Sequence, residues 1–94
     1  MNGRDSQNER EILEGIVTDT QRLISETRAN RREWHELRQE VEAMFARGDM
    51  TRLTYDVHKE RLRRSGQDID CCLRSLERQM KIALQKLYGI GENG

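Results

Sequence analysis

Apolar residues in residues 6–47 recur at alternating spacings of three and four, the pattern of a helix that presents one stripe to a partner helix. Two predicted seams share this spacing: Leu13, Thr20, Thr27, Trp34 and Val41 form one, and Ile16, Leu23, Asn30, Leu37 and Met44 form the other. The stripe is widened on one side by Val17, Ile24 and Phe45. This extra width favours contact with more than one neighbouring helix.

The ends of this first helix also carry signals. Ser6 and Glu9 have the spacing of a capping box, in which each side chain satisfies a backbone N–H of the other residue. Gly48 can adopt the left-handed conformation that ends a helix. The sequence therefore predicts a helix over 6–47 and a turn over 48–50.

A second helix is predicted over 51–88, with Thr51 as its cap and Met50 placed to pack on Tyr55. Its two seams are Leu62, Ile69, Leu76 and Ala83, and Gly66, Leu73, Met80 and Leu87. Gly89 is expected to end the helix, with Ile90 folding back toward Leu84. Residues 89–94 are expected to form a flexible tail.

Short helix connections make antiparallel neighbours, so the predicted fold is all-α, a coiled-coil-like antiparallel two-helix hairpin in one domain over 1–94. Two such helices bury only one seam, and dimerisation into a four-helix bundle would bury more. The residues assigned to self-association are Ile12, Val17, Ile24, Phe45 and Leu84. A break near Ala29 and Asn30 would instead give a three-helix bundle, and the pair Ser65 and Gly66 could kink the second helix.

Composition narrows the class of protein. Apolar residues make up 34% of the chain, below the roughly 45–50% of ordinary domains. Charged residues make up 36%, with seventeen of each sign. No stretch approaches the length of a membrane helix and no secretory signal is seen, so a cytoplasmic protein is expected. Of the two cysteines, Cys72 is expected to flank the seam and Cys71 to point outward.

No constellation of catalytic, metal-binding or cofactor-binding residues emerges. Residues 89–94 have the glycine spacing of a dinucleotide-binding loop, but that loop must lie between a strand and a helix. Arg47-Gly48-Asp49 is accounted for by a helix-ending turn. His35 and His58 lie several helical turns apart in the predicted hairpin and cannot share a zinc ion. We therefore expect a protein that is not an enzyme.

The basic residues predict a surface feature. If the turn centres near residue 49, position i of the first helix faces roughly position 98 minus i of the second. Two groups of basic residues then lie at one level: Arg28, Arg31, Arg32 and Arg38 on the first helix, and Lys59, Arg61, Arg63 and Arg64 on the second. These are the "arginine belt", and Trp34 lies at the same level. They could be solvated helix faces with pairs such as Glu60–Arg64, or a docking surface, since Arg and Trp are enriched at interfaces.

The segment 34–73 resembles small bacterial helical-hairpin modules, including the small subunit of exonuclease VII. The resemblance rests on the apolar spacing up to Phe45, on Gly48-Asp49-Met50 and on the charged helix with Glu60-Arg61. It covers less than half of the chain and assigns no role to any residue. It implies an accessory subunit.

The predicted function is that of a small protein–protein interaction module, an accessory, adaptor or inhibitor protein. It would act as a homodimer and engage a protein partner through Trp34 and the arginine belt. The alternative is a nucleic-acid-associated factor using the same belt, although such domains are usually strongly basic. A purely structural spacer is a third possibility. No membrane or small-molecule partner is expected.

Overall fold

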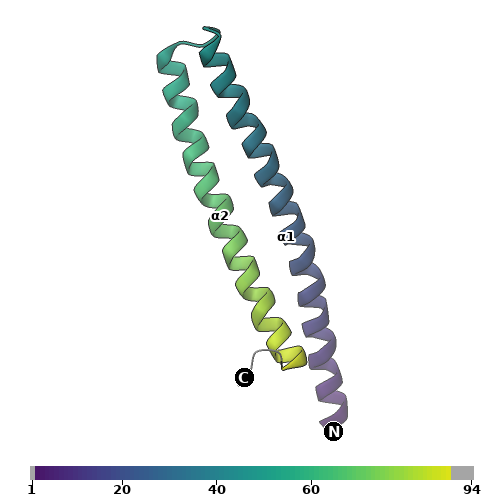
Figure 1. The fold of residues 1–94 in the computed structure, drawn as a ribbon. Helices are drawn as coiled ribbons and strands as arrows, with labels where there is room; N and C mark the ends of the chain where they lie inside the picture. Colours follow the sequence, from purple (N-terminus) through teal and green to yellow (C-terminus); the bar gives the residue numbers. More distant parts are fainter. Residues whose placement is uncertain (1, 90–94) are drawn as a thin grey trace. The chain divides into compact units, whose positions relative to one another are not determined.

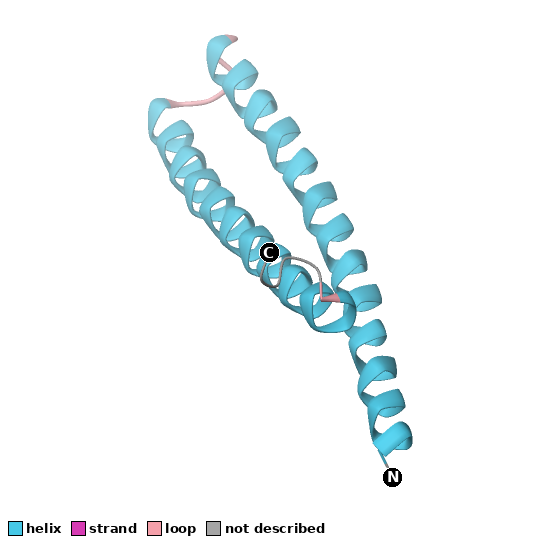
Figure 2. Ribbon diagram, turned by 60° about the horizontal axis from the view of Figure 1, so that its bottom comes forward, coloured by secondary structure: helices cyan, strands magenta, loops and turns pink. Residues whose placement is uncertain are grey.

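The structure, a computed structural model, describes residues 2–89 and the side chains of residues 7–89. It is an all-α helical hairpin of two helices, α1 (Asn2–Ala46) and α2 (Arg52–Tyr88), joined by a short turn (Figure 1). No strand occurs within residues 2–89 (Figure 2). None of the described helices is long and apolar enough to cross a bilayer.

The two continuous helices confirm the predicted hairpin, and their bounds differ from the predicted ones by a few residues. Helix α1 begins at Asn2, before the predicted start at Ser6, and the predicted capping box lies outside the described side chains. Helix α1 also continues through Ala29 and Asn30, so the three-helix alternative is wrong. Helix α2 continues through Ser65 and Gly66.

The turn begins with a Schellman motif, as the glycine predicted. Gly48 has a φ of 80°, in the left-handed region. The Asp49 N–H donates to the Met44 carbonyl at 2.9 Å, and the Gly48 N–H donates to the Phe45 carbonyl at 3.1 Å. These bonds satisfy carbonyls that the end of α1 leaves without helical partners.

Thr51 caps α2, which confirms the prediction. Its hydroxyl oxygen accepts a hydrogen bond from the Thr54 N–H at 3.2 Å, the bond expected of an N-cap. The Tyr55 ring stacks on Phe45, with ring centroids 4.0 Å apart and planes 9° from parallel. At the other end of α2, Gly89 has a φ of 68°, as predicted. The predicted return of Ile90 lies outside the described residues.

The chain divides into two compact units, each pairing a segment of α1 with a segment of α2. The terminal unit comprises Met1–Glu26 and Leu73–Gly94, and the turn unit comprises Thr27–Cys72. In the terminal unit, Ile24 packs with Leu73 and Leu76 against the partly buried Met80. In the turn unit, Val41 of α1 and Leu62 of α2 are buried.

The predicted seams of α2 are confirmed, because Leu62, Leu73, Leu76 and Ala83 are its buried apolar residues. The predicted first seam of α1 is also confirmed by burial of Thr20 and Val41.

The predicted second seam of α1 is wrong. Ile16 is 42% exposed, Leu23 is 41% exposed and Leu37 is 50% exposed. Burial instead extends to the neighbouring column, where Ile24 is buried and Val17 is partly buried. Helix α1 thus carries three heptad-spaced columns, and α2 covers two of them.

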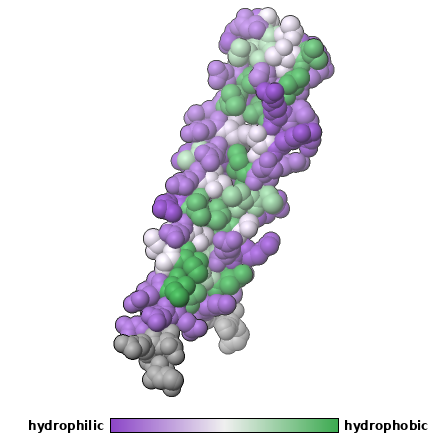
Figure 3. All heavy atoms as spheres, turned by 180° about the vertical axis from the view of Figure 1, so that it is seen from behind, coloured by the Kyte–Doolittle hydropathy of each residue, from purple (hydrophilic) through white to green (hydrophobic). Residues whose placement is uncertain are grey.

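The columns that α2 covers include residues that the sequence assigned to self-association. Ile24 is buried in the contact with α2, and Phe45 stacks on Tyr55. Ile12 is 64% exposed and Leu84 is partly buried. Figure 3 shows patches of hydrophobic surface on one face of the molecule, separated by hydrophilic residues.

Candidate protein-binding surfaces

Trp34 is the residue around which the turn unit is organised. Its indole Nε1–H donates to the Leu62 carbonyl at 2.7 Å, from one helix to the other. Its ring lies over Gly66, where a Cβ atom would come within 2.8 Å of Cζ2. Such a distance is not tolerated without movement, so glycine is needed for this contact.

The two contacts of Trp34 have one structural cause. In an α-helix the Leu62 carbonyl also accepts the N–H of the residue four positions later, which is Gly66. The missing side chain at Gly66 leaves this stretch of backbone open, so that the flat indole can reach the carbonyl. A glycine in a helix interior costs about 1 kcal/mol, and here the burial of an aromatic ring and a hydrogen bond offset that cost.

Trp34 was predicted to be an anchor for a partner protein. The structure shows its N–H engaged within the chain and its ring partly buried. What remains for a partner is the part of the ring that faces solvent. His35 contacts the ring edge-on, with centroids 4.9 Å apart, and the Arg38 guanidinium carbon lies 5.8 Å from the ring centroid.

The register of the turn unit agrees with the predicted facing rule. Its interhelical contacts include Trp34–Leu62, Phe45–Tyr55 and Arg31–Asp70. Each falls within about one helical turn of the position expected from the rule. The arginine belt therefore does lie at the level of Trp34.

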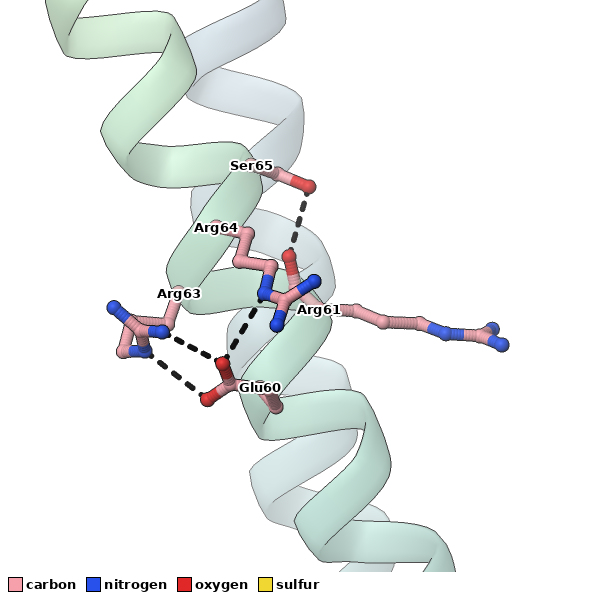
Figure 4. Close-up of polar contacts among 5 residues, drawn as sticks. All are labelled: Glu60, Arg61, Arg63, Arg64 and Ser65. Atoms are coloured by element: carbon pink, nitrogen blue, oxygen red, sulfur yellow. Dashed lines mark hydrogen bonds and ion pairs between the residues drawn. The ribbon is translucent and has the colours of Figure 1, made fainter.

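The members of the arginine belt, however, differ in the residues that they contact. Arg31 Nε lies 3.7 Å from the Asp70 carboxylate. Arg63 donates twice to Glu60, at 2.6 and 3.0 Å, and Arg64 donates to the same carboxylate at 3.2 Å (Figure 4). Arg61 extends away from this cluster (Figure 4). Arg28 and Arg32 are exposed on α1.

Glu60 is held in its charged form by these arginines. The hydrogen bond from Arg63 is the largest cause that lowers the pKa of Glu60 from 4.5 to about 2, and Arg64 adds to the effect. The same contact raises the pKa of Arg63. The predicted Glu60–Arg64 pair is confirmed, and Glu60 serves Arg63 as well.

Two open cavities flank Trp34 in the turn unit, and we call them together the Trp34 groove. The larger, of about 450 Å³, has as its charged lining residues Arg38, Lys59, Arg63, Glu42, Asp56 and Glu60. The smaller, of about 340 Å³, is lined by Arg31, Arg38, Arg63 and Asp70, with Trp34 and Ile69 as its large apolar residues. Arginines therefore outnumber carboxylates only in the smaller cavity.

Other sequence-based expectations concern reactive groups. Cys71 and Cys72 are both exposed, as predicted for Cys71, so Cys72 is not a buried core residue beside the seam. Among the described residues, no three His, Cys, Asp or Glu side chains gather as metal ligands would.

Comparison of the chain with protein-family models, with curated proteins and with solved structures gives no significant match. The local resemblance to the small subunit of exonuclease VII finds no support in these comparisons.

Proposed function

We propose that the protein is a non-catalytic protein–protein interaction module that acts as a homodimer. The observation that carries this proposal is the column of α1 that α2 leaves largely uncovered, which we call the open column: Ile16, Leu23, Asn30, Leu37 and the partly buried Met44. Four of its five members are apolar and all are seven residues apart. Ile16 and Leu23 in the terminal unit, and Leu37 in the turn unit, are each at least 41% exposed.

A heptad-spaced apolar column is the pattern that a second helix covers by knobs-into-holes packing. Scattered exposed leucines are common on protein surfaces and need no explanation. The open column differs because its members share one register along one helix. A second copy of the chain could cover it and would gain the burial that one hairpin lacks.

The surface area supports the same proposal. The chain exposes 7454 Å², about a third more than the roughly 5,700 Å² of a compact monomer of its mass, 11.1 kDa. One partner's share of a standard interface is about 800 Å², which the excess could supply. None of the described side chains is fully buried within a single chain, so a single hairpin has little interior of its own.

Variants of the open column test the proposal. Leu37→Gln and Leu23→Gln should each weaken dimerisation, because an amide would replace an apolar knob in the interface. Leu53→Gln is the matched control, since Leu53 is 76% exposed and lies on the outer side of α2. Light scattering coupled to gel filtration measures the molar mass, and circular dichroism checks that helix content is kept.

The expected result is a dimer for the wild type and for Leu53→Gln, and a dissociating dimer for the open-column variants. Variants of Leu23 and Leu37 that dimerise as tightly as the wild type would place the interface elsewhere.

A further inference from the structure

We infer that the smaller cavity of the Trp34 groove binds an acidic segment of a partner protein, with a carboxylate paired to Arg38. The inference rests on the proposed interaction function, but it concerns a different face from the open column. Arg31 and Arg38 lie about 100–120° around α1 from Leu37, on the other side of the Trp34 column, which lies between them and the open column. One surface would make the dimer and the other would recognise the partner.

The first argument is the pairing of charges. Arg31 is opposite Asp70, and Arg63 is bound to Glu60. Arg38 forms no ion pair with any carboxylate in residues 7–89, and its guanidinium lies over the Trp34 ring. A carboxylate entering the groove would therefore meet a guanidinium that has a planar fork of donors to offer.

The second argument is preorganisation. Side-chain ordering is one of the main costs of association. Arg38 lies over the Trp34 ring, where a cation–π contact is favourable, and the Leu62 carbonyl holds that ring in place. Arg38 is therefore partly positioned before a ligand arrives.

The third argument is the mixed chemistry of the lining. Trp34 and Ile69 offer apolar surface beside the arginines. An acidic segment that carries an apolar side chain next to its carboxylate would match both. Aromatic and arginine side chains together are also typical of the strongest contacts in protein interfaces.

A nucleic-acid backbone fits less well. The larger cavity of the groove shares Trp34, Arg38 and Arg63 with the smaller one, and its lining includes Glu42, Asp56 and Glu60. These carboxylates would repel a continuous run of phosphates, whereas a short acidic motif can stop before reaching them. The chain also has no net charge at pH 7, whereas nucleic-acid-binding domains are usually strongly basic.

Trp34 is the only tryptophan in the chain, so its fluorescence reports directly on the groove. The probes are a blocked peptide of glutamates around a central leucine, the same peptide with glutamine for glutamate, and single-stranded oligothymidylate. Each is titrated into the wild type, into Arg38→Gln and into Arg61→Gln. The last variant removes the same charge from a side chain that points away from Glu60 (Figure 4).

We expect the acidic peptide to change Trp34 emission saturably and the glutamine peptide to leave it unchanged. Arg38→Gln should bind the acidic peptide about tenfold more weakly, as loss of a charge-assisted hydrogen bond implies. Arg61→Gln should bind within about twofold of the wild type, because rim charges contribute little.

Three results would overturn the inference: no response to the acidic peptide, an equal response to the glutamine peptide, or equal loss in Arg38→Gln and Arg61→Gln. Tighter binding of oligothymidylate than of the peptide would assign the groove to nucleic acid. Molar mass is measured on the same samples, so failure of the groove is distinguished from failure to dimerise.

Discussion

The indole ring of Trp34 in α1 lies directly on the backbone of Gly66 in α2, because Gly66 has no side chain to hold the ring away. The same ring lies 5.8 Å from the Arg38 guanidinium carbon and lines both cavities of the groove. The consequences of the contact between Trp34 and Gly66 can be measured.

Gly66→Ala should destabilise the protein by about 1–2 kcal/mol, because the new methyl group would overlap the indole and the overpacking cost exceeds the gain in helix propensity. Gly15→Ala is the matched control, since no atom lies within 4 Å of a Cβ at Gly15. That variant should stabilise the protein by about 0.5–1 kcal/mol. Urea unfolding measures both. Two alanines that stabilise equally would show that the Trp34–Gly66 contact is absent.

Trp34→Phe should destabilise the protein by about 1–2 kcal/mol, through loss of one hydrogen bond and of part of the buried ring. The Leu62 carbonyl keeps its helical N–H partner, so no buried acceptor is left unsatisfied. Thermal unfolding followed by circular dichroism measures the effect. A neutral result would mean that the indole N–H bond to Leu62 does not form in solution.

Thr51→Ala should cost about 1 kcal/mol of stability, because it removes the oxygen that accepts the Thr54 N–H. Thr51→Ser keeps an equivalent oxygen and should cost little. Urea unfolding of both variants decides the matter. Equal losses in the two would assign the effect to the methyl group of Thr51 rather than to its capping oxygen.

The Glu60 carboxylate should titrate with a pKa of about 2 rather than 4.5. Because the pKa is lowered in the folded state, this group stabilises the protein above pH 4.5, and the contribution is lost as the pH falls toward 2. Arg63→Gln should raise the pKa toward 4.5, and Arg61→Gln should not. Carbon-13 NMR of the side-chain carboxyl measures the midpoint. High salt should weaken the effect, because the cluster is exposed.

The sequence predicted α2 more accurately than α1, for a physical reason. Helix α2 has leucines at Leu62, Leu73 and Leu76, and no competing column of similar apolarity. Its seams were therefore unambiguous. The turn was equally clear, because Gly48 and Thr51 have local chemical roles that do not depend on the rest of the fold.

Helix α1 has three heptad-spaced columns, and hydrophobicity alone predicts the wrong two as the columns that α2 covers. One of the two columns that α2 covers contains Val17, Ile24 and Phe45, but also Arg31 and Arg38. A hydrophobicity pattern counts these arginines as interruptions. In the structure both arginines line the smaller cavity of the groove and remain exposed, as long side chains with an aliphatic stem and a charged end can.

The Trp34 groove could be predicted only in part. The level of Trp34 and the arginines followed from the position of the turn. That Gly66 receives the indole could not be foreseen, because a glycine in a helix is more simply interpreted as a weak point. Which arginines are engaged by Glu60 and Asp70 depends on side-chain positions that spacing does not determine.

The most direct test of the central claim is sedimentation equilibrium of the wild-type chain over a wide range of concentrations. Association of the open columns of two copies predicts a molar mass that rises to twice 11.1 kDa and then stays constant. A mass that remains at 11.1 kDa at every concentration, in a chain that is fully helical by circular dichroism, would contradict it.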